Sequence, residues 1–239
     1  MTKYEKISVL ARETAKRISA NREEWIRYLD VASRLYKYPF EDQILIYAQR
    51  PDATACASLE MWNEKMFCWV NRGAKGIALL DGESERPRLR YVFDVTDVHK
   101  AKRIGRDPFI WHLREEHKEA VLAGLEHIYG STNDSLSFES RIYEIAAGIA
   151  EDFYEEAVDE VIDAAVNSFL EDLDGDVVSV RFREMLVQSV SYIVLKRCGC
   201  DMTEFADDFT FDYIHEFNTL RTISVLGSST SELCEPMLV

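Results

Sequence analysis

The sequence predicts an α+β fold in which a small, mostly antiparallel sheet packs on helices in the first half and an acidic, all-helical bundle follows. The spacing of apolar residues changes from helical to alternating near residue 65 and becomes helical again near residue 108. Charge is uneven as well, because residues 1–108 carry 20 Lys and Arg against 16 Asp and Glu, whereas residues 109–239 carry 8 against 27. We therefore predict two domains, covering residues 1–107 and 108–239.

The first 65 residues are expected to form helices, with one strand before the last of them. Apolar residues recur at helical spacing, and Asn21 followed by Glu24 resembles a capping box. Pro39 and Pro51 each mark the end of a helix, because proline in a helix interior removes a hydrogen bond. The expected helices cover residues 4–19, 22–38, 41–50 and 59–65, and the expected strand covers residues 53–58.

Strands are expected next, joined by one basic turn. The alternating segments cover residues 66–70, 76–80 and 88–95. The stretch "WVNRGAKGIALL", residues 69–80, places Arg72 and Lys75 beside glycines, and this turn is expected to join the first two strands into a two-stranded ribbon. A polar loop over residues 81–88 leads to the third strand. These strands predict a small sheet packed against the preceding helices.

The second half is predicted to be an acidic helical bundle. The expected helices cover residues 109–130, 136–175, 178–199 and 209–227, of which the second is either one long helix or a broken one. Residues 228–239 resemble the beginning of a further helix. Two alternatives stay open from this ending, a part of a longer polypeptide or a free-standing effector.

Composition excludes several classes of protein. The 47% of apolar residues suffices for a packed core, but no run approaches the roughly 20 apolar residues of a membrane-spanning helix. The amino terminus carries charges where a signal peptide would be apolar. The five cysteines are odd in number and unevenly spaced, which indicates free thiols in a reducing compartment. We expect a cytoplasmic protein without membrane contact.

No motif predicts catalysis. The glycine turn is followed by an expected strand, whereas a phosphate-binding loop requires a helix at that point. His112 and His117 lie five residues apart and do not match the HExxH spacing of a zinc protease, and Cys198 and Cys200 have no second pair nearby. Paired acidic residues on the helices are expected to form solvated faces. We predict no enzyme, no metal and no cofactor.

The predicted ribbon combines aromatic and basic residues. Phe67 and Trp69 lie two positions apart and so are expected on the same face of a strand. Two interpretations stay open: both rings belong to the core, or they stack on bases while Arg72 and Lys75 neutralise phosphates. Any nucleic-acid site is expected in the first half, because the acidic half repels phosphate.

Residues 20 to 98 resemble the N-terminal single-stranded-DNA-binding domain of the antirestriction protein ArdC family. The resemblance lies in "YPFEDQILIYAQRPDATACASLEMWNEKMFCWVNRGAKGIALLD" and, after it, "YVFDVTDV". The residues that fit the family pattern are Gln43, Gln49, Pro51, Trp62, Val70, Gly73, Lys75, Gly76, Ile77, Phe93 and Asp94. The chain departs from the pattern at residues 41–42 and 71–72, which implies weaker DNA binding than in typical members.

The resemblance implies a counter-defence protein of a mobile genetic element that binds single-stranded DNA. In the family a zinc-protease domain with an HExxH helix often follows, and that motif is missing from this sequence. The same domain also begins large polyvalent proteins with methylase and helicase modules, and the acidic half resembles the segment that follows it there. The residues expected to contact DNA are Arg50, Trp62, Lys65, Trp69, Arg72, Lys75 and Arg90. The cations would follow the phosphates, and Trp69 or Trp62 would offer a stacking face.

A second prediction concerns the acidic half. Its charge would allow it to imitate DNA and to bind a host defence nuclease, such as a restriction enzyme or a CRISPR nuclease, which makes the chain an anti-CRISPR candidate. A third interpretation also stays open, in which the helical half serves only for dimerisation or as a spacer.

Overall fold

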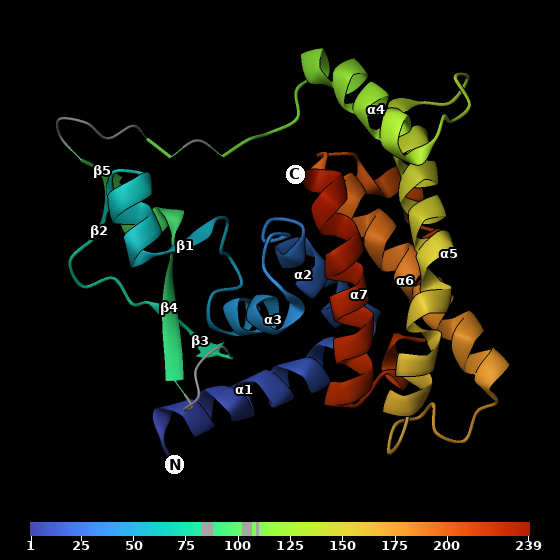
Figure 1. Cartoon of the computed structure of the whole chain (residues 1–239), viewed down its shortest axis with the longest axis horizontal. Coiled ribbons are helices and arrows are strands. Elements are labelled where there is room, and N and C mark those ends of the chain that lie inside the picture. Colours follow the sequence, from blue (N-terminus) through green and yellow to red (C-terminus); the bar gives the residue numbers. More distant parts are fainter. Residues whose placement is uncertain (83–87, 102–106, 109) are drawn as a thin grey trace. The chain divides into compact units, whose positions relative to one another are not determined.

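The computed structural model describes residues 1–82, 88–101, 107–108 and 110–239, and Figure 1 shows the course of the chain. The chain forms two compact units. The sheet unit comprises Met1–Thr14 and Glu41–Trp111, and the helical unit comprises Ala15–Phe40 and His112–Val239. Residues 15–40 thus group with the later helices, while the domain boundary after residue 107 stays a prediction.

Helices dominate the described residues. The α-helices are α1 (Lys3–Ile18), α2 (Arg22–Ala32), α3 (Phe40–Gln49), α4 (Glu115–Tyr129), α5 (Phe138–Ala164), α6 (Gly175–Arg197) and α7 (Leu220–Leu238). The shorter segments are the π-helix η1 (Met61–Lys65) and the 3-10 helices η2 (Val95–Asp97), η3 (Met202–Phe205) and η4 (Ile214–Glu216). The side chain of Asn21 accepts a 3.0 Å hydrogen bond from the Glu24 amide, so α2 begins as predicted.

The strands form two small antiparallel sheets, which confirms the predicted α+β fold class. They are β1 (Cys56–Ser58), β2 (Cys68–Val70), β3 (Ile77–Asp81), β4 (Arg88–Asp94) and β5 (Val98–Lys100). One sheet has the order β1-β4-β3, and the other pairs β2 with β5. Most of the predicted loop over residues 81–88 lies outside the described residues.

The predicted ribbon of β2 and β3 is wrong, because each strand pairs in a different sheet. The Asn71 amide donates a 2.8 Å hydrogen bond to the Asp97 carbonyl, which continues the β2–β5 pairing past the end of β2. The chain then turns at Gly73, whose φ of +89° is a conformation that glycine adopts without strain. The basic turn therefore connects two sheets, and β3 places its buried Ile77 and Leu79 beside β4.

Side-chain bonds to the backbone hold the sheet unit together. The Gln49 carboxamide makes two hydrogen bonds with Ala78, one to its carbonyl (2.8 Å) and one from its amide (3.0 Å), so α3 is fixed to β3. Asp94 is buried, and its carboxylate accepts hydrogen bonds from the amides of Thr54, Ala55 and Thr96. A buried carboxylate with several amide donors fixes the local backbone, because losing it would leave those donors unsatisfied.

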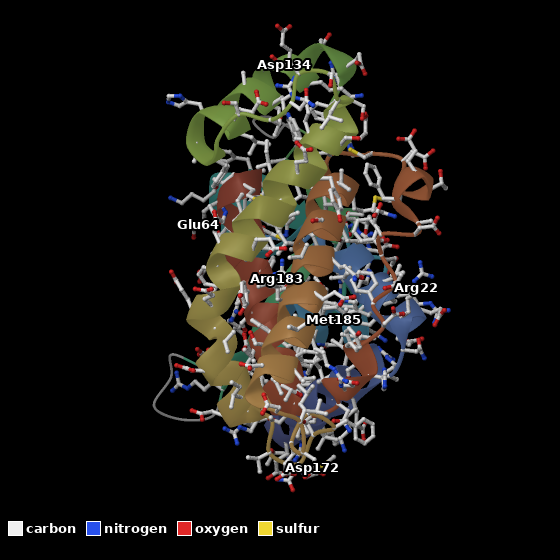
Figure 2. All side chains as sticks on the ribbon, turned by 90° about the vertical axis from the view of Figure 1, so that its right-hand side faces the viewer. Arg22, Glu64, Asp134, Asp172, Arg183 and Met185 are labelled. Atoms are coloured by element: carbon white, nitrogen blue, oxygen red, sulfur yellow. The ribbon has the colours of Figure 1, made fainter. Side chains whose placement is uncertain are left out.

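The helical unit packs α2, α5, α6 and α7 around one core. The Trp25 indole N–H donates a 3.0 Å hydrogen bond to the Ser189 hydroxyl, and the Tyr192 hydroxyl donates a 2.8 Å bond to Asp30, so α2 is joined to α6. In Figure 2, α6 lies alongside α5 and carries the labelled Arg183. Arg183 forms an ion pair with Glu151 of α5, with 2.7 Å between Nη2 and Oε1.

Several predicted helix ends in the second half are wrong. Residues 220–238 form one continuous helix, so α7 passes through the glycine at position 227, where the sequence predicted an end. Residues 209–219 form turns and η4, while α5 stops at Ala164 and a turn follows. The expected helix start at Phe109 lies outside the described residues, and α4 begins at Glu115. Among the described residues, none of the helices combines the length and apolar character needed to span a bilayer.

Candidate nucleic-acid interface

One short segment of the sheet unit exposes an unusual number of large apolar side chains. We call this set the apolar strip; it consists of Leu59, Met61, Met66, Phe67 and Trp69, each between 42% and 49% exposed. The strip begins before η1 and ends in β2. Because large apolar side chains in water are unfavourable, a group of five in eleven residues indicates a contact surface.

The backbone of this segment is unusual in two ways. Residues 61–65 form a π-helix, a rare conformation that is frequent at functional sites. Phe67, which follows it, has a φ of +52° in the left-handed region that non-glycine residues rarely occupy. Such strain costs on the order of 1 kcal/mol or more. Phe67 is 45% exposed, so this cost is not offset by burying the whole ring in the core.

Strand β5 positions the aromatic end of the strip. Trp69 of β2 lies opposite His99 of β5, and both are exposed. The Ala101 amide donates a 2.9 Å hydrogen bond to the Phe67 carbonyl, which carries the pairing to the residue before β2. Both rings of the predicted aromatic pair are therefore in water, and the interpretation that they belong to the core is wrong.

Three of the predicted cations lie close to the strip in the chain. Lys65 ends η1, and Arg72 and Lys75 lie in the turn between β2 and β3. All three are exposed, and within the described part of the chain none of them forms an ion pair. An exposed cation without a counter-charge is available to a phosphate, because no existing pair has to be broken first.

Arg50 is held differently. Its guanidinium donates a 2.9 Å hydrogen bond to Asp97 and a 2.7 Å bond to the Thr96 hydroxyl, and it lies 3.4 Å from Asp52. These bonds connect the end of α3 to η2. A phosphate would compete with carboxylates for this guanidinium, so Arg50 has a structural role here.

Arg90 and Trp62 are also used by the fold. Arg90 forms an ion pair with Asp42, whose carboxyl is almost fully buried; burial raises the pKa of Asp42, and the attraction of Arg90 opposes this. The Trp62 indole is 4% exposed and donates a 2.8 Å hydrogen bond to the Phe93 carbonyl. The expectation that Trp62 offers a stacking face is therefore wrong, because a buried ring cannot meet a base.

The seven predicted residues thus separate into two groups. Lys65, Trp69, Arg72 and Lys75 are exposed within eleven residues of chain, whereas Arg50, Trp62 and the exposed but ion-paired Arg90 make bonds that hold the fold. Leu59, Met61, Met66 and His99 were missed. No local signal marks them, because the exposure of a methionine, or the pairing of β5 with β2, depends on contacts distant in the chain.

The chemistry of this surface is aromatic and basic. Within the described ranges, no group of three or more His, Cys, Asp or Glu is placed to hold a metal ion. Comparisons with protein-family models, with curated proteins and with solved structures each return no match for this chain.

Proposed function

We propose that this chain is a non-enzymatic protein that binds single-stranded DNA through the apolar strip and the cations Lys65, Arg72 and Lys75. The observation that carries the proposal is the exposure of Phe67 and Trp69 within eleven residues of chain that also contain three exposed cations, which form no ion pair with the described residues. The resemblance to the ArdC N-terminal domain supports an antirestriction role in a mobile genetic element.

The physical chemistry of the surface suits an unpaired strand. Each base stacked on an aromatic ring contributes about 1–3 kcal/mol, and every base has a face that can stack. Lysine and arginine add a salt-dependent attraction to phosphates. Binding is therefore expected to tolerate different sequences and to weaken as salt is added. A duplex is expected to bind less well, because its bases are already stacked on each other.

A binding titration tests the proposal. Fluorescence anisotropy of a labelled 15-nucleotide oligothymidine is measured with the whole chain and with Arg72→Glu plus Lys75→Glu. The matched control is Lys6→Glu plus Arg12→Glu, which makes the same charge change at exposed positions of α1 in the same unit. We expect the first variant to lose at least tenfold in affinity and the control to lose less than threefold.

Two outcomes contradict the proposal. The first is an absence of binding at micromolar concentrations of the unmodified chain in low salt. The second is an equal loss in both double variants, which would show that only net charge matters.

A second candidate function rests on charge. The helical unit carries 14 Lys and Arg against 30 Asp and Glu, whereas the sheet unit carries 14 against 13. An acidic surface can occupy the basic DNA-binding cleft of a nuclease.

Mixing the chain with a restriction enzyme or a CRISPR nuclease, followed by size-exclusion chromatography without DNA, tests this candidate. Co-elution that added duplex DNA abolishes is the expected result, and separate elution contradicts it.

A further inference from the structure

A second exposed apolar surface lies in the helical unit, where α5 ends and α6 begins. We call it the hairpin patch; its exposed side chains are Ile162, Val166, Phe169, Val177 and Val180. Phe169 is the most exposed of these, at 64%. The two helix ends are adjacent, because a Cβ placed on Gly175 would lie 3.5 Å from the Ile162 side chain.

The hairpin patch is held in place by the fold. Arg183 pairs with Glu151 and lies over the ring of Tyr154, 5.7 Å from its centre, so α6 is fixed against α5. Val177 and Val180 are three residues apart on α6 and share one helix face. Their exposure therefore follows from packed helices, and a partner would find the patch already formed.

The turn that carries Phe169 is also well connected. The Phe169 amide donates a 3.1 Å hydrogen bond to the Asn218 side chain, and the Asn167 amide donates a 2.9 Å bond to Glu171. The neighbours Ser168 and Leu170 are buried. The backbone thus anchors the turn on both sides while the phenyl ring points into water.

The surroundings of the hairpin patch carry one sign of charge. Residues 151–180 contain eleven Asp and Glu and no Lys, Arg or His. The exposed acidic residues close to the patch in the chain are Asp159, Glu160, Asp163, Glu171, Asp172, Asp174 and Asp176. Asp172, labelled in Figure 2, marks the turn between α5 and α6. A second copy of this chain would bring the same negative charges against them, so self-association through this face is disfavoured.

We propose that the hairpin patch docks a basic amphipathic helix of a partner protein. The apolar face of such a helix would cover Ile162, Phe169 and Val180, and its lysines or arginines would meet the acidic rim. Recognition of an amphipathic helix by an apolar surface uses anchors at positions i, i+3, i+4 and i+7. This inference goes beyond DNA binding by the sheet unit, and either can fail without the other.

Isothermal titration calorimetry of the whole chain with synthetic peptides tests the inference. The probe is an 18-residue peptide with leucines on one helical face and lysines elsewhere. One control peptide has glutamates in place of the lysines, and another has the same composition with the leucines scattered around the helix. We expect the probe to bind at least tenfold more tightly than either control.

Protein variants locate the binding surface. Phe169→Ser and Val180→Ser should each weaken binding of the probe at least fivefold. The matched control is Ile128→Ser, which removes a 68% exposed apolar side chain from α4 in the same acidic unit and should leave binding unchanged. Asp163→Asn plus Asp172→Asn keeps the apolar side chains and should also weaken binding, which provides a second route if a serine variant fails to fold.

Three results overturn the inference. The first is equal binding of the probe and the scattered peptide, because the attraction would then be a matter of charge alone. The second is unchanged binding by the serine variants with intact helical circular dichroism. The third is a dimer of the unmodified chain, seen by analytical ultracentrifugation, that Phe169→Ser dissociates, because the patch would then be covered by a second copy.

Discussion

Trp69 lies directly opposite His99 in the β2–β5 pair, with both side chains exposed. Side chains of directly opposed residues in antiparallel strands lie on the same face, so the indole and the imidazole are neighbours. Nδ1 of His99 lies 2.7 Å from the Asn71 side-chain oxygen, within hydrogen-bonding distance. This hydrogen bond holds the imidazole beside the indole at the end of the apolar strip.

Removal of the exposed indole is expected to weaken DNA binding. Trp69→Ala should lower the affinity for oligothymidine by about 5- to 150-fold, which corresponds to the loss of one stacked base. Anisotropy titration measures the effect. Trp111→Ala removes an exposed indole outside both sheets and should lower the affinity by less than threefold. A Trp69→Ala variant that binds like the unmodified chain contradicts stacking at this position.

The salt dependence of binding is expected to distinguish the two groups of cations. Each phosphate contact on a single strand contributes about −0.7 to the slope of log affinity against log salt concentration. Arg72→Gln should therefore make the slope less steep by about that amount and leave thermal stability unchanged.

Arg50→Gln serves as the comparison for that slope. It should keep the slope and lower the melting temperature, because it breaks the bonds of Arg50 to Asp97 and Thr96. If Arg50→Gln changes the slope as much as Arg72→Gln does, then the paired arginine also contacts DNA.

Substitutions of Phe67 are expected to separate stability from binding. Glycine adopts a φ of +52° without strain and alanine does not, so Phe67→Gly should unfold at the same or higher denaturant concentration than Phe67→Ala. Both variants should bind oligothymidine more weakly, because both lack the ring. Chemical denaturation and anisotropy measure the two effects. Should the alanine variant prove the more stable one, residue 67 does not hold a left-handed conformation.

The buried carboxylate of Asp94 is expected to make stability depend on pH. Burial alone would raise its pKa, but hydrogen bonds from the Thr54, Thr96 and Ala55 amides outweigh burial and hold the pKa below its usual range. The stabilisation is therefore present above about pH 4, the pKa of an unfolded aspartate, and is lost as the pH falls through the lowered pKa.

The Asp94→Asn variant tests this assignment. An asparagine side chain has one oxygen that accepts hydrogen bonds and one NH2 group that only donates. The backbone amides that bond to one of the two Asp94 carboxylate oxygens therefore lose their acceptor, at a cost of about 1–3 kcal/mol at pH 7. The difference in unfolding free energy between variant and unmodified chain should shrink as the pH is lowered from 6 to 3. A difference that stays constant over this range would assign the pH dependence to other groups.

Gly227 of α7 is expected to tolerate no side chain. A Cβ at this position would lie 2.6 Å from Cγ of the buried Phe40 ring, and closer still to other atoms of that ring. Gly227→Ala should destabilise the chain by about 1–3 kcal/mol, as overpacked cores do. Gly124→Ala, in an exposed part of α4 with no atom within 4 Å, should stabilise it by up to about 1 kcal/mol. Calorimetric melting compares the two, and equal effects contradict the close packing of α7 on Phe40.

Several parts of the fold were predictable because their signals are local. The predicted cap of α2 is present in the structure, and it depends only on Asn21 and Glu24, which are three residues apart. The helix expected to end at the glycine at position 227 shows the limit of such signals. A glycine often ends a helix, but this one is needed inside α7 to admit the Phe40 ring, and that ring comes from nearly two hundred residues earlier in the chain.

In the candidate site too, some features follow from neighbouring residues and others from contacts between residues distant in the chain. Residues 69–75 stood out in the sequence because cations, glycines and an indole are adjacent there. In the sequence alone Arg72 and Arg50 are indistinguishable, since a sequence shows a charge without its partner. The structure separates them, because Asp97 lies beside Arg50 and no described carboxylate pairs with Arg72.

The amino-acid sequence by itself determined the α+β class, the acidic character of the second half and the place of the basic turn, because apolar spacing and charge are properties of neighbouring residues. The tertiary structure alone decided that β2 pairs with β5, that Trp62 is buried and that Trp69 remains in water. Strand pairing and burial depend on contacts between residues distant in the chain, which local patterns do not specify.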